Sequence, residues 1–143
     1  MNETQFHKEL PLSSFQGVFA CDELRPPLKL PASYIVNTDP RSKPGKHWTA
    51  IYIDKNGCGE YFDSFGLKPN KHILAFLKRV CKKAIYNTKR LQHNKSISCG
   101  VYCIYFLRRR HNMASLPQIF ASFSTDNKID NEFKLINYFN KSF

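Results

Sequence analysis

Several features that would indicate other protein classes are missing from this sequence of 143 residues. No apolar run approaches the roughly 20 residues of a membrane-spanning helix, and the N-terminus lacks the basic-then-apolar order of a signal peptide. Five cysteines, an odd number without framework spacing, do not suit a disulfide scaffold. We therefore expect a single domain, residues 1–143, that carries free thiols in an intracellular, reducing compartment and needs no membrane.

Acidic residues are absent from residues 67–111, which contain twelve lysines and arginines. Residues 1–66 hold seven basic and eight acidic residues, and residues 112–143 hold three of each. A middle third with a net charge of +12 predicts a polyanionic partner, most simply DNA, although such a surface can also serve solubility alone. The candidate nucleic-acid-binding residues are Lys78, Arg79, Lys82, Lys83, Lys89, Arg90, Arg108, Arg109 and Arg110.

Metal-binding spacing is also missing. The sequence has no C-x-x-C pair, and Cys99 and Cys103, four positions apart, have no matching pair of histidines or cysteines. We therefore expect neither a metal nor a small-molecule cofactor, and we expect Cys103 to pack in the core.

The residues that are present predict an α+β fold with a small mixed or antiparallel sheet, a central helix and flanking helices. A short helix and an extended, proline-rich segment are expected in the first thirty residues. Asn56-Gly57 predicts a hairpin between strands 47–53 and 59–63. Further strands are expected at 34–37 and 84–91, and helices at 69–84, 99–110, 116–123 and 129–140.

Cys99 begins the central helix, where free backbone N–H groups and the positive end of the helix dipole stabilise a thiolate. Gly100 removes side-chain bulk beside it and would let a substrate backbone approach closely. The alternative is a small apolar residue at the start of a buried helix. The polar Ser96 and Ser98 favour an accessible site.

His47 and Asp63 lie at the two ends of the predicted hairpin, where antiparallel pairing brings them to the same edge of the sheet. Such a pair would serve Cys99 as general base and orienting carboxylate, and Gln92 would offer an amide donor to an oxyanion. Each residue alone has an ordinary alternative: a surface or core histidine, a turn-capping aspartate, a loop glutamine. Together they indicate a thiol hydrolase.

These residues resemble the adenain family, the adenovirus-type maturation cysteine proteases, and more distantly the Ulp/SENP peptidases that process ubiquitin-like proteins. The resemblance covers about residues 33–107 and includes the similar closing segment 137–143. Its motifs are Ile35-Val36-Asn37-Thr38, Gly45-Lys46-His47-Trp48, Phe62-Asp63-Ser64-Phe65-Gly66, Gln92 and Ser98-Cys99-Gly100-Val101-Tyr102-Cys103.

The resemblance implies a cysteine-protease architecture with Cys99 as nucleophile, His47 as general base and acid, Asp63 as orienting carboxylate and Gln92 as oxyanion-hole amide. The spacing from Gln92 to Cys99 is more similar to adenain than to Ulp. Adenains are stimulated by DNA and by a short viral peptide that can form a disulfide, and Cys81 stands at a spacing similar to that of their peptide-linking cysteine. Trp48 and Gly100 are consistent with a narrow slot over a small substrate residue.

Three functional hypotheses follow. The first is a monomeric cysteine endopeptidase that cleaves viral, or virus-like element, precursor proteins at Gly-containing sites during particle maturation. It would act in the virion and host nucleus, with DNA and a short viral peptide as candidate activators. The second is the same chemistry on a ubiquitin-like modifier. The third is a basic, DNA-binding virion protein without enzymatic activity.

Overall fold

The computed structural model describes residues 1–45, 47–93 and 98–142. Lys46 and residues 94–97 and 143, which fall in segments discussed above, lie outside the described residues. The elements follow one another as α1 (Glu3–Glu9), β1 (Phe15–Ala20), β2 (Ala32–Asn37), β3 (Trp48–Ile53), β4 (Cys58–Phe62), α2 (Lys71–Val80), β5 (Lys83–Tyr86), α3 (Cys99–His111), α4 (Leu116–Ala121) and α5 (Lys128–Ser142).

The strands form one mixed sheet in the order β1-β2-β3-β4-β5. β2, β3 and β4 are antiparallel, as the hairpin at Asn56-Gly57 predicts, whereas β1 and β5 add to the two edges in parallel. The α+β class, with a central helix that begins at Cys99, is confirmed. The prediction for the first thirty residues is incomplete, because residues 15–20 pair with β2 and form an edge strand.

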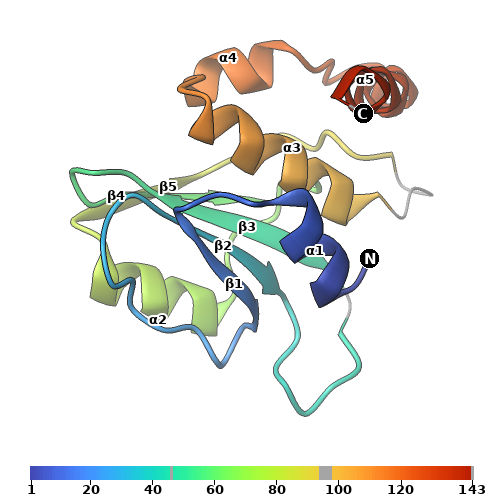
Figure 1. The fold of residues 1–143 in the computed structure, drawn as a ribbon. Coiled ribbons are helices and arrows are strands. Elements are labelled where there is room, and N and C mark those ends of the chain that lie inside the picture. The colour runs from blue at the N-terminus through green and yellow to red at the C-terminus, as the bar shows by residue number, and fades with distance from the viewer. Residues whose placement is uncertain (46, 94–97, 143) are drawn as a thin grey trace.

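Helices cover both faces of the sheet, with α2 on one face and α3, α4 and α5 on the other (Figure 1). Each face therefore has its own core, and alternate residues of a strand enter different cores. Tyr34 and Val36 pack toward α2, whereas Ile35 between them packs toward α3. Burial on both faces explains why β2 and β3 are almost continuously apolar, without the alternation of a half-exposed strand.

The ends of α1 and α2 follow from local capping. Asn2 and Gln5 form a reciprocal capping box at the start of α1, and the Asn70 side chain accepts the N–H of Ile73 at the start of α2. α2 ends at Val80, four residues before the predicted end, because residues 83–86 pair with β4 instead. Cys81 therefore caps the helix and does not lie within it.

Candidate active site

His47 and Asp63 meet at the open end of the β3–β4 hairpin, as predicted. His47 immediately precedes β3 and Asp63 immediately follows β4, and the pairing of Ala50 with Phe62 sets this register. The His47 Nε2 atom lies 2.7 Å from Asp63 Oδ1. Asp63 is only 2% exposed, so this charge-assisted hydrogen bond is shielded from water.

Cys99, the first residue of α3, lies beside His47, and the two side chains interact. Because Nε2 is bound to Asp63, Nδ1 is the ring nitrogen left to face the thiol. The backbone N–H groups of Trp48 and Gly100 also stabilise the sulfur. Three residues that are distant in the sequence thus interact in series, the thiol with the imidazole and the imidazole with the carboxylate.

Hydrogen bonding shifts the pKa values of Cys99 and His47 in opposite directions. Burial raises the pKa of the Cys99 thiol, but the contacts with His47 and with two backbone N–H groups outweigh burial, and the net pKa is lowered. Burial lowers the pKa of His47, but its bonds to Asp63 and Cys99 outweigh burial and raise the pKa to about 9. Both shifts favour the thiolate–imidazolium pair over the neutral thiol and imidazole.

The Asp63 carboxylate is held by the turn that follows β4. Its Oδ1 atom accepts the N–H of Phe65 at 2.8 Å as well as the bond from His47. Asn87, 8% exposed, binds the Asp63 backbone on both sides: its Oδ1 accepts the N–H and its Nδ2 donates to the carbonyl. Asn87 is a supporting residue that sequence reasoning missed, since it lies 24 positions away.

Phe65 provides a wall for the imidazole. The rings of His47 and Phe65 stack with centroids 4.6 Å apart, and the Arg90 guanidinium lies 4.4 Å from the Phe65 centroid. Arg90 also donates through Nε to the Gln92 carbonyl. Arg90, a candidate nucleic-acid-binding residue, thus contacts residues of the candidate active site. The sequence before Gln92 contains no proline or glycine and no motif that indicates these contacts.

Gln92 is 1% exposed and firmly held. Its N–H donates to the Ser64 carbonyl at 3.0 Å, and its side-chain Oε1 accepts the Ser64 hydroxyl at 2.5 Å. Ser64 stands next to Asp63 in the sequence, so the turn after β4 connects Gln92 to the His47–Asp63 pair. The role of Gln92 as an oxyanion donor stays a prediction.

Gly100 is buried and faces the start of the chain, and a substrate contact at this residue stays a prediction. A Cβ at this position would lie 3.1 Å from Phe6 Cζ and 3.3 Å from Met1 Sδ. The missing side chain therefore makes room for the start of the chain and α1, which pack against α3. Trp48 is half-buried, packs edge-on against Phe6, and lines a small pocket of about 160 Å³ together with Asn37 and Gly45. A substrate contact at Trp48 stays a prediction.

The basic residues divide into two groups. Lys78, Arg79, Lys82, Lys83 and Lys89 are exposed around the end of α2 and the edge strand β5. Arg108 pairs with Glu9 and Arg110 with Glu60, each at 2.8 Å, and their side chains are only 17% and 15% exposed. Arg109 donates to the Tyr105 hydroxyl at 2.6 Å. These charges hold α3 to α1 and to β4, and a basic track that includes Arg108 and Arg110 stays a prediction.

Cys81 lies half-buried against β4, where a Cβ at Gly59 would be 2.5 Å from its sulfur. Burial, with a smaller contribution from nearby Cys58, raises the pKa of Cys81. This environment disfavours a thiolate, in contrast with Cys99. A disulfide between Cys81 and an activating peptide stays a prediction.

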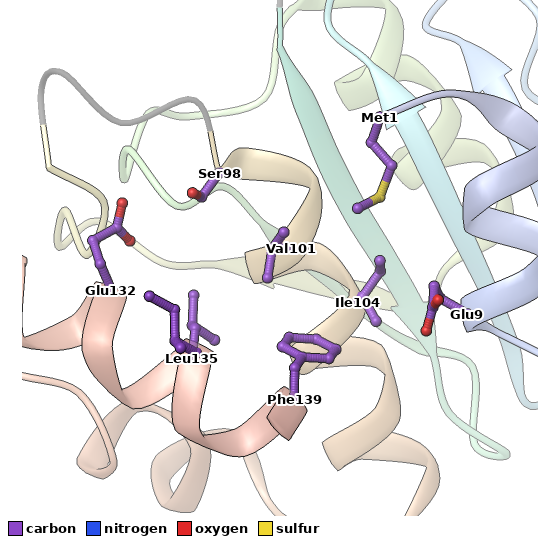
Figure 2. Close-up of a pocket in the computed structure, with 9 residues that line it drawn as sticks. Met1, Glu9, Ser98, Val101, Ile104, Glu132, Leu135 and Phe139 are labelled. Atoms are coloured by element: carbon purple, nitrogen blue, oxygen red, sulfur yellow. The ribbon is translucent and has the colours of Figure 1, made fainter. Parts of the chain in front are cut away.

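An apolar pocket of about 370 Å³ adjoins the helix that carries Cys99. Figure 2 shows it between the start of the chain, one face of α3 and α5. Its lining includes Met1, Ser98, Val101, Ile104, Leu135 and Phe139. His47, Asp63 and Cys99 do not line it, so it is distinct from the candidate active site.

Residues 1–45, 47–93 and 98–142 contain no group of three or more His, Cys, Asp or Glu side chains placed to hold a metal ion. None of their helices combines the length and apolar character that crossing a membrane requires.

Comparison with known proteins identifies relatives among viral proteases. The sequence profile described as adenovirus endoprotease matches residues 15–129. The cysteine protease S273R of African swine fever virus, isolate Tick/Malawi/Lil 20-1/1983, is 32% identical over 104 residues, which are 64% of this chain and 38% of that protein. Its counterpart from isolate Pig/Kenya/KEN-50/1950, named SUMO-1 cysteine protease S273R, is 30% identical over 107 residues, 66% of this chain and 39% of that protein.

The fold agrees with a solved relative. The crystal structure of the African swine fever virus pS273R protease superposes with a TM-score of 0.63 at 20% identity, and covers 92% of this chain and 62% of that one. The chain spans less than two fifths of the length of the two curated relatives. The family profile, in contrast, matches most of the chain and includes His47, Asp63, Gln92 and Cys99. The chain therefore belongs to the adenovirus endoprotease family.

Proposed function

We propose that this chain is a cysteine endopeptidase in which Cys99 attacks a peptide carbonyl. The observation that supports this most directly is the arrangement of Cys99 beside His47 and of His47 on Asp63. In it the pKa of the Cys99 thiol is lowered and the pKa of the His47 imidazole is raised. A reactive thiolate, a proton carrier and an orienting carboxylate are the groups that thiol acyl transfer requires.

In the first half-reaction, the Cys99 thiolate forms a C–S bond with the carbonyl carbon while the C=O π electrons move to oxygen. The tetrahedral intermediate then collapses, the C–N bond breaks, and the leaving amine takes a proton from His47 Nδ1. Asp63 accepts the hydrogen bond from Nε2–H and so orients the ring with Nδ1 left to serve the thiol. In the second half-reaction, His47 takes a proton from water, whose oxygen attacks the thioester and releases the thiolate.

The decisive experiment is selective alkylation. Iodoacetamide at neutral pH should modify Cys99 faster than Cys21, Cys58, Cys81 and Cys103, and His47→Ala should abolish the preference. Mass spectrometry of the peptides identifies the modified thiol. Labelling of all five cysteines at similar rates, with no peptide cleaved when DNA is present, would favour the inert, DNA-binding virion protein instead.

For the substrate, we infer Gly-containing sites in viral, or virus-like element, precursor proteins that are cleaved during particle maturation. The viral relatives and the narrow space beside Trp48 support this class. On this proposal the protein acts as a monomer in the virion and host nucleus, or in another reducing intracellular compartment. A peptide library with Gly at each position, assayed with and without DNA, tests the preference.

A second candidate is processing of a ubiquitin-like modifier, which the name SUMO-1 cysteine protease of one relative favours. The chemistry at Cys99 would be the same, and only the substrate differs. A modifier with an electrophilic C-terminus should then label Cys99, and Gly-x-Gly or Gly-Gly peptides should not be cleaved. Rapid cleavage of the peptides without labelling by the modifier excludes this candidate.

DNA as an activator is supported by the exposed lysines around α2 and β5, which form no ion pair with an acidic side chain among the residues that the structure describes. Lys82→Gln/Lys83→Gln should weaken DNA binding and flatten its salt dependence, whereas Lys8→Gln/Lys29→Gln, a control with equal loss of charge, should not. Affinity measured between roughly 50 and 200 mM salt separates the two. If both double variants lower DNA affinity equally, the lysines around α2 and β5 do not form a specific DNA-binding surface.

We also retain a short viral peptide as a candidate activator, bound at Cys81. Its half-buried thiol at the end of α2 supports only exchange with a docked peptide that carries a disulfide: the Cys81 sulfur forms the new S–S bond and the second sulfur of the peptide disulfide leaves as a thiolate. Non-reducing mass analysis after incubation with the peptide supplied as a mixed disulfide should show an adduct at Cys81 in the wild type and none there in Cys81→Ser.

A further inference from the structure

The turn after β4 holds both halves of the candidate site. Asp63 and Phe65 contact His47, by a hydrogen bond and by stacking. Ser64, between them, faces Gln92: its carbonyl accepts the N–H groups of Leu91 at 2.8 Å and Gln92 at 3.0 Å, and its hydroxyl donates to Gln92 Oε1 at 2.5 Å. Ser64 is 0% exposed, so no water competes for these bonds.

The backbone around Gln92 is also held from the opposite direction. Asn131 of α5, 0% exposed, donates Nδ2 to the Leu91 carbonyl at 2.9 Å, and the Tyr102 hydroxyl approaches the same oxygen at 3.4 Å. Arg90 Nε donates to the Gln92 carbonyl at 3.1 Å. The backbone of Leu91 and Gln92 is therefore held at both carbonyls and both N–H groups.

The direction of the Gln92 side-chain amide decides whether it helps or hinders acyl transfer. Its NH2 end stabilises a developing oxyanion, whereas its oxygen end would repel it. The two ends have nearly the same shape, so packing alone does not distinguish them. The Ser64 hydroxyl, bound to Oε1, makes the oxygen end the anchored one and turns the NH2 end into the donor for the reaction.

We propose that Ser64 is a positioning residue of the oxyanion hole, which orients the Gln92 amide so that NH2 and not Oε1 meets the substrate oxyanion. This inference rests on the proposed function, because an oxyanion arises only if Cys99 attacks a carbonyl. It adds a residue that acts through Gln92 and touches no substrate.

The test compares Ser64→Thr with Ser64→Val, which have the same shape and the same packing cost and differ in the hydroxyl. Valine should lower kcat by about tenfold or more relative to threonine, with KM nearly unchanged, because an oxyanion donor acts in the transition state. In the otherwise wild-type chain, Ser64→Ala should also lower kcat by about tenfold or more. In the Gln92→Ala background, the same Ser64→Ala change should lower kcat little further. Iodoacetamide alkylation of Cys99 should be equal in all variants, since it forms no oxyanion.

Equal kcat for the threonine and valine variants would overturn the proposal, and so would a Ser64→Ala loss that is the same with and without Gln92. Slower alkylation of Cys99 in Ser64→Val than in Ser64→Thr would also overturn it, because the hydroxyl would then act on the thiolate pair. If the wild type neither cleaves substrate nor alkylates selectively at Cys99, the proposed function itself fails, and this inference fails with it.

Discussion

Cys99 and Cys103 lie one turn apart on α3, but their surroundings give the two thiols opposite chemistry. Cys99 is half-buried at the start of the helix, interacts with His47, and has a lowered pKa. Cys103 is fully buried in the core beneath the sheet, and burial, with a smaller contribution from the nearby Cys99 and Asp63, raises its pKa well above the ordinary cysteine value. The neighbours that each thiol meets, above all His47 beside Cys99, and not the residue type, decide which cysteine is reactive.

The largest effect expected from this comparison is on catalysis. Cys99→Ala should abolish cleavage, because no other thiol contacts His47 in the described structure, whereas Cys103→Ala should keep turnover within about threefold of wild type. Steady-state cleavage of one peptide substrate by both variants measures the contrast. Residual turnover in Cys99→Ala would identify a different nucleophile.

Removal of the imidazole should have the next largest effect. His47→Ala deletes both the partner of the thiolate and the proton donor to the leaving amine, and we expect a loss of about 10²- to 10⁴-fold in kcat/KM. Asp63→Asn keeps the shape of the carboxylate and should cost less. If Asp63→Asn reduces kcat/KM as much as His47→Ala, the carboxylate does more than orient the ring.

The pH dependence follows from the two opposite shifts. The Cys99 pKa is lowered, so its alkylation should remain fast below pH 9, whereas His47→Ala should move the rise in rate up toward the ordinary cysteine value of about 9. Cleavage also needs protonated His47, so it should decline as the pH passes about 9. Alkylation of the wild type should not decline there, because the thiolate persists. Rates from pH 5 to 10 check both limbs.

Stability should show the reverse contrast between the two cysteines. Cys103→Ala leaves a small cavity in a packed core and should lower the free energy of unfolding by about 1–2 kcal/mol. Cys99→Ala, at a half-exposed helix start, should change stability less. Urea unfolding monitored by circular dichroism compares them, and a larger loss for Cys99→Ala would mean that the ion pair contributes to folding.

The smallest effect is expected at Gly100. An alanine there meets Phe6 and Met1 at 3.1–3.4 Å but gains helix propensity of up to about 1 kcal/mol, so the two terms nearly cancel. KM for a peptide substrate should stay within about twofold of wild type. A tenfold rise in KM with unchanged stability would support the idea that Gly100 borders the substrate.

The hairpin, the central helix and the meeting of His47 with Asp63 could be predicted from the sequence, because each depends on local turn chemistry or on helical periodicity. The edge strand β1 could not, since residues 15–20 have no period-two pattern and become a strand only by pairing with β2. The same limit applies to the charges of residues 108–110. Their sequence marks a basic helix end, and only the fold brings Glu9 and Glu60 to Arg108 and Arg110.

The sequence by itself determined the chemical groups of the candidate site and the order in which they occur. The tertiary structure alone decided how they are held: Ser64 reaches Gln92 across 28 positions, and Asn131 reaches Leu91 across 40. Hydrogen bonds between distant segments depend on the packing of whole elements, and neither propensity nor periodicity encodes that packing locally. The sequence likewise shows that residue 100 is small, but only the packing of α1 against α3 shows that Gly100 makes room for Phe6.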